Sequence, residues 1–258
     1  MHVRELFGLS EKVAIVTGGS RGLGLQMATA LGEAGASLVL TARKADELAA
    51  AAAGLTARGV RALAVPCDVS RADEVDAAVA RTLQAYGRVD ILLNNAGATW
   101  GASILEMPLE AWRKVMETNV DGMFLMARAA GRAMIDAGRG GKIVNIASVA
   151  GLVGADAGVL DAIGYSTSKG AVIAFTRDLA VKWARHRITV NAIAPGYFPS
   201  KMTRWLIEHR GEAILDTIPM GRWGGEDDLK GAALFLASPA SDFITGHILV
   251  VDGGQTAR

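Results

Sequence analysis

The strongest constraint in this sequence is a regular alternation of short apolar runs and helical runs along almost the whole chain. The apolar runs have little polar character, which is typical of strands buried on both faces of a parallel sheet. The expected strands lie at 12–18, 37–43, 60–70, 89–97, 141–148, 187–196 and 247–254. Helical runs separate them, at 23–36, 45–59, 72–87, 109–137, 165–186 and 226–237. This order predicts an α/β fold, with a seven-stranded parallel sheet covered by helices on both faces. No linker-like segment interrupts the pattern, so we expect one domain over residues 1–258.

Composition excludes several classes of protein. The chain is 51% apolar and 21% charged with a net charge of +1, which supports a folded core and gives no overall charge for nucleic acid or an anionic membrane. Residues 1–12 carry charges where a signal peptide needs an apolar run, and no stretch resembles the roughly 20 apolar residues of a membrane helix. The single cysteine, Cys67, fits a reducing compartment, and the histidines show no metal-ligand spacing. We expect a cytoplasmic protein with no nucleic-acid, membrane or metal partner.

The segment VTGGSRGLG, residues 16–24, places four glycines in nine positions between the first strand and the first helix. Glycine weakens helices and strands, so this density indicates a need for bare backbone. Backbone amides at a helix start can approach a pyrophosphate, whose charge the helix dipole favours. Gly18, Gly22 and Gly24 therefore predict a dinucleotide site. Their spacing is not the common G-x-G-x-x-G, and a structural tight turn is the alternative.

The end of the second strand bears on which dinucleotide is bound. An acidic residue there would bind a ribose 2′-hydroxyl, but residues 40–44 read LTARK and contain no acid. Arg43 in this segment and Arg21 in the glycine loop both lie near the expected ribose. Two guanidinium groups and no carboxylate favour the 2′-phosphate of NADP(H). Surface arginines at a helix start are the alternative. Asp68, after the third strand, could accept from the adenine amino group or cap the following helix.

A second group of residues points to acid–base chemistry. Tyr165 and Lys169, in the sequence YSTSK, lie four residues apart and share one face of a helix. A phenol has a pKa of about 10, and a neighbouring ammonium lowers it, which makes the pair a usable acid–base for carbonyl–alcohol interconversion. Ser148 ends the preceding strand, where its hydroxyl could donate to a carbonyl or act only as a cap. Asn119 stands inside an expected helix, where asparagine is a poor choice unless it makes an interior hydrogen bond.

In this order, the motifs resemble the short-chain dehydrogenase/reductase family over residues 12–254. The segments are TGGSRGLG at 17–24, DV at 68–69, NNAG at 94–97, NV at 119–120, Ser148, YSTSK at 165–169, NAIAPG at 191–196 and DGG at 252–254. The resemblance implies a single Rossmann-like domain and an NADP(H)-dependent oxidoreductase. It also implies a homotetramer formed through the helices at 109–137 and 165–186 and the last strand.

The resemblance further implies a catalytic tetrad of Asn119, Ser148, Tyr165 and Lys169. Tyr165 would exchange the proton and Ser148 would hold the substrate oxygen. Lys169 would lower the tyrosine pKa and bind the nicotinamide ribose, and Asn119 would hold a water that connects Lys169 to solvent. The implied cofactor contacts are Gly18, Ser20, Arg21, Gly22, Leu23, Gly24, Arg43, Asp68, Val69, Asn95, Ala96, Gly97, Tyr165, Lys169, Pro195, Gly196 and Ser200. Threonine is more usual in the family at the position of Ser200.

Two segments depart from a minimal version of this pattern. Seventeen positions separate Ser148 from Tyr165, more than is common in the family, and the added residues fall within 154–164. We expect this loop to reshape the substrate pocket without moving the tetrad. Residues 196–225 form a 30-residue segment after the sixth strand, too long for a simple connector, and we expect a helical substrate lid there.

The substrate is a small-molecule carbonyl or alcohol. The apolar residues of the lid and its basic Lys201, Arg204 and Arg210 fit an acyl thioester on an acidic carrier, as in the 3-oxoacyl-[acyl-carrier-protein] reductases that the chain resembles. The same charges fit the carboxylate of a sugar acid, as in the gluconate 5-dehydrogenases that it also resembles, so a sugar-acid or polyol dehydrogenase is the alternative. A non-catalytic NADP-binding regulator is a remote alternative, because the tetrad is intact.

Overall fold

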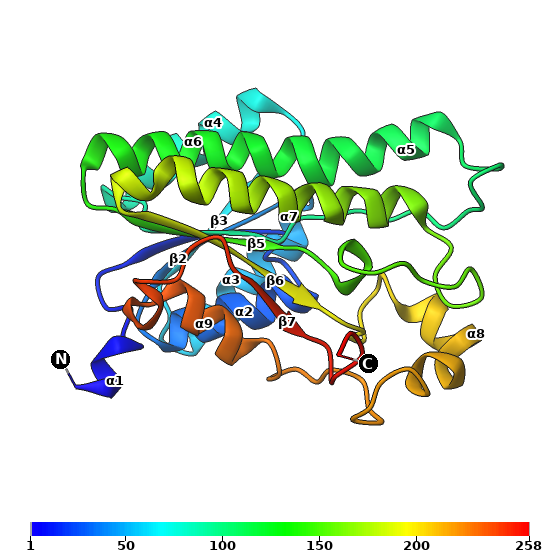
Figure 1. Ribbon diagram of the computed structural model, residues 1–258. Coiled ribbons are helices and arrows are strands. Elements are labelled where there is room, and N and C mark those ends of the chain that lie inside the picture. The colour runs from blue at the N-terminus through cyan, green and yellow to red at the C-terminus, as the bar shows by residue number, and fades with distance from the viewer. Residues whose placement is uncertain (1, 258) are drawn as a thin grey trace.

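A computed structural model describes residues 2–257 and contains one seven-stranded parallel sheet (Figure 1). Its strand order is β3-β2-β1-β4-β5-β6-β7. The strands are β1 (Val13–Thr17), β2 (Ser37–Ala42), β3 (Ala62–Pro66), β4 (Ile91–Asn94), β5 (Gly141–Ile146), β6 (Ile188–Pro195) and β7 (Ile248–Val251). The predicted fold class is confirmed. The order reverses direction between β1 and β4, and in sheets of this kind ligands bind beyond the strand ends at that point.

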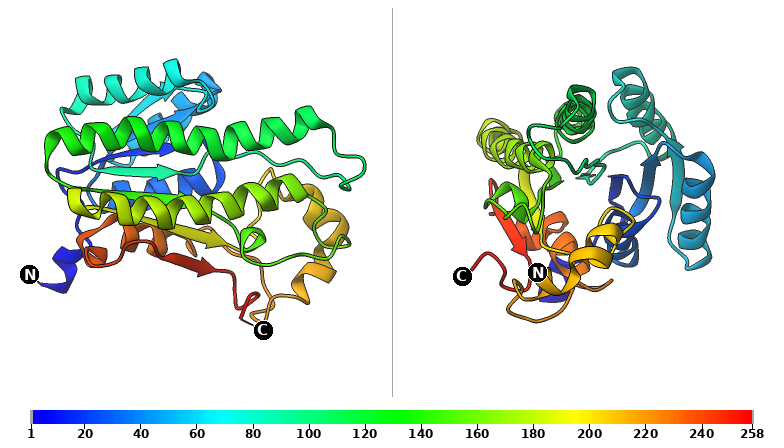
Figure 2. Two further views of the ribbon diagram at one scale, coloured as in Figure 1. Left: turned by 45° about the horizontal axis from the view of Figure 1, so that its top comes forward. Right: turned by 90° about the vertical axis from the view of Figure 1, so that its right-hand side faces the viewer.

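Two layers of helices cover the sheet, as Figures 1 and 2 show. Helices α2 (Gly22–Glu33), α3 (Ala45–Ala57) and α9 (Lys230–Ala237) pack on one face, whereas α4 (Ala72–Tyr86), α6 (Gly122–Ala137) and α7 (Ile163–Trp183) pack on the other. Strand β1 shows why both layers are needed. Ala14 and Val16 belong to the core under α2, whereas Val13 and Ile15 belong to the core under α6. All of β1 is therefore buried, because its alternate side chains face two apolar layers.

The predicted long helix at 109–137 is interrupted where a candidate catalytic residue lies. Helix α5 (Leu109–Met116) runs into a π-helical turn, Glu117–Asp121, and then into α6. The turn contains Asn119 and inserts an extra residue into the helical repeat, a feature found frequently at functional sites. The structure also has a short N-terminal helix, α1 (Val3–Leu6), which the sequence pattern did not predict.

The carboxyl end of the sheet carries the irregular segments. Helix α8 (Arg204–Leu215) lies at this end, together with the loops before α5 and α7, whereas α1 lies at the opposite end (Figure 1). Among residues 2–257, no helix is both long and apolar enough to cross a membrane. Parallel strands thus bring residues that are far apart in the chain to one edge.

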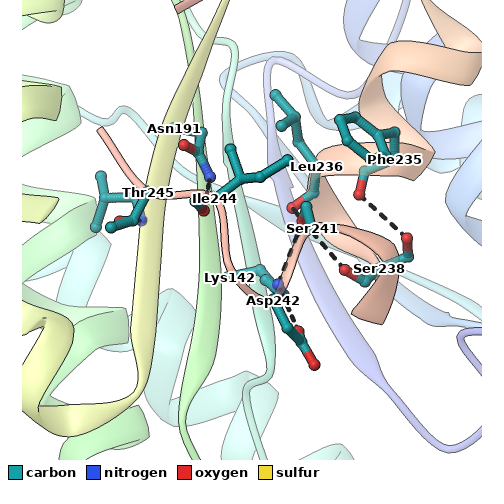
Figure 3. Close-up of polar contacts among 10 residues, drawn as sticks. Lys142, Asn191, Phe235, Leu236, Ser238, Ser241, Asp242, Ile244 and Thr245 are labelled. Atoms are coloured by element: carbon teal, nitrogen blue, oxygen red, sulfur yellow. Dashed lines mark hydrogen bonds and ion pairs between the residues drawn. The ribbon is translucent and has the colours of Figure 1, made fainter. Parts of the chain in front are cut away.

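The amino end of the sheet holds a cluster of polar contacts (Figure 3). Lys142 of β5 donates to Ser241 Oγ at 3.2 Å and pairs with Asp242 at 2.8 Å. Burial lowers the pKa of Lys142, although the hydrogen bond and charge of Asp242 act in the opposite direction. Asn191 of β6 donates to the Ile244 carbonyl at 2.9 Å. These contacts attach the segment between α9 and β7 to the central strands.

Candidate active site

The glycine loop connects β1 directly to α2, and its glycines serve different purposes. Gly18 and Gly22 have φ angles of +64° and +53°, which side chains disfavour. A Cβ at Gly22 would meet no atom within 4 Å, so this position is open toward the space above the loop. A Cβ at Gly24 would lie 2.3 Å from the Gly18 carbonyl oxygen, so Gly24 is required by packing within the loop. The approach of a ligand to bare backbone therefore explains the glycine at position 22. The glycine at position 24 is explained by close packing inside the loop.

Asn95 holds the glycine loop in place. Its side-chain amide donates to the carbonyls of Thr17 at 3.0 Å and Gly18 at 3.2 Å. The Thr17 hydroxyl in turn accepts from the backbone N–H groups of Asn95 and Ala96, each at 2.9 Å. The ends of β1 and β4 are thus tied together at the switch point of the sheet, which fixes the loop without any ligand.

Most of the predicted cofactor residues surround one cleft, whose volume is about 590 Å³. This volume lies in the range typical of ligand sites. The cleft brings together Gly18, Ser20, Arg21, Gly22, Leu23, Gly24, Arg43, Asp68, Val69, Asn95, Ala96, Gly97, Tyr165, Lys169 and Ser200. Gly196 lines a neighbouring pocket instead, and Pro195 lines neither. An open helix N-terminus, a preformed loop and flanking cations fit a dinucleotide in this cleft.

The cationic rim of the cleft contains a carboxylate that the sequence analysis missed. Glu47, in the first turn of α3, pairs with Arg21 at 2.7 Å and Lys44 at 2.8 Å. The hydrogen bond from Lys44 lowers the pKa of Glu47, and the charges of Arg21 and Lys201 act in the same direction. The only sequence signal is an acidic residue three positions after Lys44. The partner in the glycine loop is 26 positions away along the chain.

Asp68 makes a local turn at the cleft wall. Its Oδ1 accepts from the Ser70 N–H at 3.1 Å and from the Ser70 hydroxyl at 2.7 Å. These contacts form a turn before α4 and do not cap that helix, whose N-cap residue is Arg71. Asp68 also lines the cleft, as the predicted adenine contact requires.

Tyr165 and Ser148 face each other across the floor of the site. Ser148 lies two positions after β5, where it caps the short helical turn Val149–Gly151, and its buried hydroxyl accepts from the Ala150 N–H at 3.2 Å. Burial raises the pKa of Tyr165, and a hydrogen bond with the side chain of Ser148 opposes this rise. The net direction is upward, opposite to the expectation from the sequence, because desolvation of the phenolate outweighs the other contributions. At neutral pH, Tyr165 is therefore a protonated phenol that can donate.

Lys169 is buried, and no carboxylate of the described residues forms an ion pair with it. Its ammonium donates to the Ile146 carbonyl at the end of β5 at 2.7 Å and lies 5.5 Å from the centre of the Tyr165 ring. The side chain is only 5% exposed, and burial lowers its pKa to about 8. Lysine has three donors, and one of them is used here, so two remain for other groups in the cleft.

Asn119 fastens the catalytic helix to the cleft wall. Its Oδ1 accepts from the Ala98 N–H at 2.7 Å, and its Nδ2 donates to the Ala98 carbonyl at 2.9 Å and to Ser168 Oγ at 2.8 Å. Both amide donors are thus committed to protein groups. A cavity of about 10 Å³ lies beside Asn119, Lys169 and Asn94, about the volume that one water needs. The Oδ1 of Asn94 is buried and has no hydrogen-bond partner among the described residues.

A second pocket of about 600 Å³ adjoins the first at Tyr165, Thr99 and Met202, which line both. Ser148 also lines this pocket, so the phenol and the serine hydroxyl face the same space. Segment 196–225 supplies Tyr197, Met202, Thr203, Trp205, Leu206 and Arg210 to the wall. Burial is the main cause of a raised pKa of Tyr197, and the charge of Tyr165 is a second cause. The two phenols are therefore near each other.

The loop at 154–164 forms part of this wall, through Leu160, Asp161 and Ala162. It is attached on two sides. Ala102 N–H donates to the Asp161 carbonyl at 3.0 Å, and Arg210 of α8 donates to the Ala157 carbonyl at 2.6 Å. Ser148 and Tyr165 line this same pocket, and the side chain of Ser148 acts to lower the pKa of Tyr165. The loop therefore forms part of the wall of the pocket that contains this pair, and its effect on the position of the tetrad stays a prediction.

Comparison with known proteins agrees with this geometry. The sequence profile of the family described as short chain dehydrogenase matches residues 12–211. The chain is 42% identical over 254 residues to gluconate 5-dehydrogenase from Gluconobacter oxydans, covering 98% of this chain and 97% of the relative. It is 40% identical over 249 residues to 3-oxoacyl-[acyl-carrier-protein] reductase from Synechocystis sp., covering 96% and 98%. The structure matches a gluconate 5-dehydrogenase from Burkholderia cenocepacia in complex with NADP and tartrate, with a TM-score of 0.94, 38% identity and full coverage of both chains.

A doubly wound parallel sheet with an acid–base pair beside a nucleotide-type cleft defines an oxidoreductase of the Rossmann type. Within that class, the chain belongs to the short-chain dehydrogenase family. The family named from the sequence motifs is confirmed.

Proposed function

We propose that the protein interconverts a ketone and a secondary alcohol with NADP(H) as the hydride carrier. The observation that carries the proposal is the position of Tyr165, which lines both the 590 Å³ cleft and the 600 Å³ pocket. A group that moves a proton must reach the substrate oxygen while the hydride carrier reaches the adjoining carbon. The junction of the two cavities meets this requirement.

When bound, the cofactor supplies or takes up the hydride. Ser148 donates a hydrogen bond to the substrate oxygen and fixes its direction. Tyr165 gives its proton to that oxygen during reduction, consistent with a phenol kept protonated by burial. Lys169 stabilises the phenolate that this transfer creates, because its ammonium lies over the ring and no carboxylate of the described residues neutralises it. Asn119 keeps the helix turn that carries Ser168 and Lys169 against the cleft wall.

The small cavity beside Lys169 supports the predicted role of a water molecule there. We propose that one water occupies it and accepts from Lys169 while donating to Asn94 Oδ1, the buried acceptor that lacks a protein partner. Asn119 then shapes the cavity. Proton return to Tyr165 would pass through Lys169 and this water.

NADP(H) is favoured over NAD(H) by the charges at the rim. Arg21, Arg43, Lys44 and Lys201 line the end of the cleft where the adenine ribose would lie. A charge-assisted hydrogen bond to a phosphate is worth about 1.5–3 kcal/mol, which corresponds to roughly one to two orders of magnitude in affinity. The Burkholderia cenocepacia relative was solved with NADP bound. Comparable use of NADH and NADPH would contradict this assignment.

For the substrate, we propose a sugar acid or polyol as the first class to test. The pocket wall combines Ser103, Glu106 and Asp161 with Arg210, so it offers hydroxyl-binding oxygens and one cation. Several relatives carry gluconate-type names. The 3-oxoacyl class favoured by the sequence remains the second candidate, carrier-bound or free, because Leu160, Met202, Trp205 and Leu206 give the same pocket an apolar side.

Segment 196–225 serves as the lid in this proposal.

The test of the substrate class is NADPH oxidation with 5-keto-gluconate and with acetoacetyl-coenzyme A, in the unmodified protein and in Arg210→Ala. Arg210→Ala removes the cation that lines the pocket and its hydrogen bond to the Ala157 carbonyl. This change should raise KM for the acidic sugar more than it lowers kcat. Turnover of the thioester alone would reverse the order of the two classes. Binding of NADPH with no turnover of any ketone would favour the regulator.

We propose a cytoplasmic homotetramer, consistent with the exposed apolar residues on the expected contact elements. Phe124 of α6 is 46% exposed, Val181 of α7 is 80% exposed and Val250 of β7 is 37% exposed. Light scattering of the purified protein tests this directly. A monomer of the 26.9 kDa chain would contradict it.

A further inference from the structure

Two carboxylates, Glu47 and Asp68, line the cofactor cleft, and Glu47 is the one that is paired with cations of the glycine loop and α3. Glu47 lines the cleft together with Arg21, Arg43, Lys44 and Lys201. Arg21, Lys44 and Lys201, from the glycine loop, the start of α3 and the lid segment, all act on Glu47, whereas the charge of Arg43 acts on Asp68. Glu47 is hydrogen-bonded to two of them, Arg21 at 2.7 Å and Lys44 at 2.8 Å.

The contacts of Glu47 are those that a phosphate would make. A carboxylate and a phosphate both accept from guanidinium and ammonium donors, and a guanidinium paired at short distance has fewer donors left for a second anion. Lys201 is also close enough for its charge to lower the pKa of Glu47. Glu47 is therefore ionised at neutral pH and lies within the site where a second anion would have to bind.

We propose that Glu47 is a specificity-determining residue that competes with the 2′-phosphate of the cofactor for Arg21 and Lys44. This inference rests on the proposed use of NADP(H). A phosphate at this position must share the donors of Arg21 and Lys44 with the carboxylate or displace it, and in both cases the negative charge of Glu47 opposes the phosphate. Glu47 thus reduces the preference of the protein for NADP(H) over NAD(H). The cations at the rim outnumber the carboxylates, so NADP(H) still binds more tightly.

Removal of this one charge tests the proposal. Glu47→Gln keeps the shape of the side chain and removes its charge, and Asp46→Asn removes an equal charge from the adjacent residue, which is outside the described cleft lining. The probes are 2′,5′-ADP, which carries the 2′-phosphate, and 5′-ADP, which lacks it. Calorimetry at fixed ionic strength gives both dissociation constants without any turnover.

Glu47→Gln is expected to tighten 2′,5′-ADP by about threefold or more and to change 5′-ADP by less than about twofold, because exposed ion pairs are weak individually. Asp46→Asn is expected to change both probes equally and slightly. Unchanged or weaker binding of 2′,5′-ADP by Glu47→Gln would overturn the role of Glu47 alone. Equal binding of the two probes by the unmodified protein would overturn the NADP(H) assignment as well.

Discussion

Two lysines, which lie near opposite ends of β5, differ in whether a carboxylate is paired with the ammonium group. Lys169 donates to the Ile146 carbonyl at the carboxyl end of the strand, and Lys142 belongs to the strand itself near its amino end. Burial lowers the pKa of both. Lys142 has the carboxylate of Asp242 at 2.8 Å, whereas Lys169 has a neutral carbonyl and a phenol ring nearby.

This difference decides which of the two ammonium groups is available for chemistry. The charge of Lys142 is already matched by Asp242, so it holds two segments together (Figure 3). Among residues 2–257, no carboxylate is paired with Lys169, so its charge is available to a phenolate formed on the Tyr165 ring, whose centre lies 5.5 Å away. An unmatched buried charge is unfavourable for folding, and such groups are typical of functional sites.

The largest contrast is expected from Tyr165→Phe, which removes the proton donor and keeps the ring. Ketone reduction should fall about 10³-fold, within the range for loss of a general acid, while NADPH binding changes little. Steady-state rates and NADPH fluorescence titration measure the two. A Lys142→Met control should retain its rate. Turnover of Tyr165→Phe close to that of the unmodified protein would remove this residue from the mechanism.

Lys169→Met should separate activity from stability. We expect a loss of about 10²-fold in reduction rate, because the phenolate loses its stabilising charge. At pH 7, the free energy of unfolding should remain equal or increase, because a desolvated ammonium is replaced by an apolar side chain of similar length. Urea denaturation measures the second quantity. A large loss of stability in this variant would indicate that Lys169 is structural, as Lys142 is.

The pH dependence of stability gives a third contrast. The pKa of Lys169 is about 8 in the folded protein and about 10.5 in the unfolded chain. Between these values the unfolded chain binds the additional proton, so this residue makes unfolding less favourable as pH rises, by up to about 1.4 kcal/mol per pH unit. From pH 7.5 to pH 9.5, the urea midpoint of the unmodified protein should therefore rise relative to that of Lys169→Met. If the urea midpoints of the two proteins changed equally between these pH values, the pKa of Lys169 would be the same in the folded protein and in the unfolded chain.

The smallest effect is expected from Lys142→Met. Asp242 is 71% exposed, and removal of the desolvated ammonium of Lys142 offsets part of the lost ion pair, so the free energy of unfolding should fall by no more than about 1 kcal/mol, or a few degrees in Tm. Scanning calorimetry detects such a shift. An unchanged Tm would mean that the cluster in Figure 3 adds nothing measurable to the attachment of β7.

The sheet, its order of elements and most of the cleft lining could be predicted because they depend on local patterns. Continuous apolar strands specify burial on both faces. The candidate residue Asn95 directly follows β4, and Ser148 lies two positions after the end of β5. The approximate helix limits also agreed, although α9 begins at Lys230 and not near residue 226.

The contacts that escaped prediction join segments that are distant along the chain. Glu47 meets Arg21, and Arg210 meets Ala157, through the fold and not through spacing. The direction of the Tyr165 pKa also escaped prediction. The sequence shows the neighbouring lysine, but the extent of desolvation of the phenol depends on how the helix and Ser148 pack around it.

The most direct test of the central claim is a site-resolved titration of the lysine ammonium groups. Nuclear magnetic resonance of protein labelled with ¹³C at lysine Cε follows each group, and Lys169→Met assigns the signal that belongs to this residue. The account predicts that this signal titrates with a pKa near 8 in the free protein. A pKa at the ordinary lysine value of about 10.4 would contradict it, because Lys169 would then be neither desolvated nor unpaired.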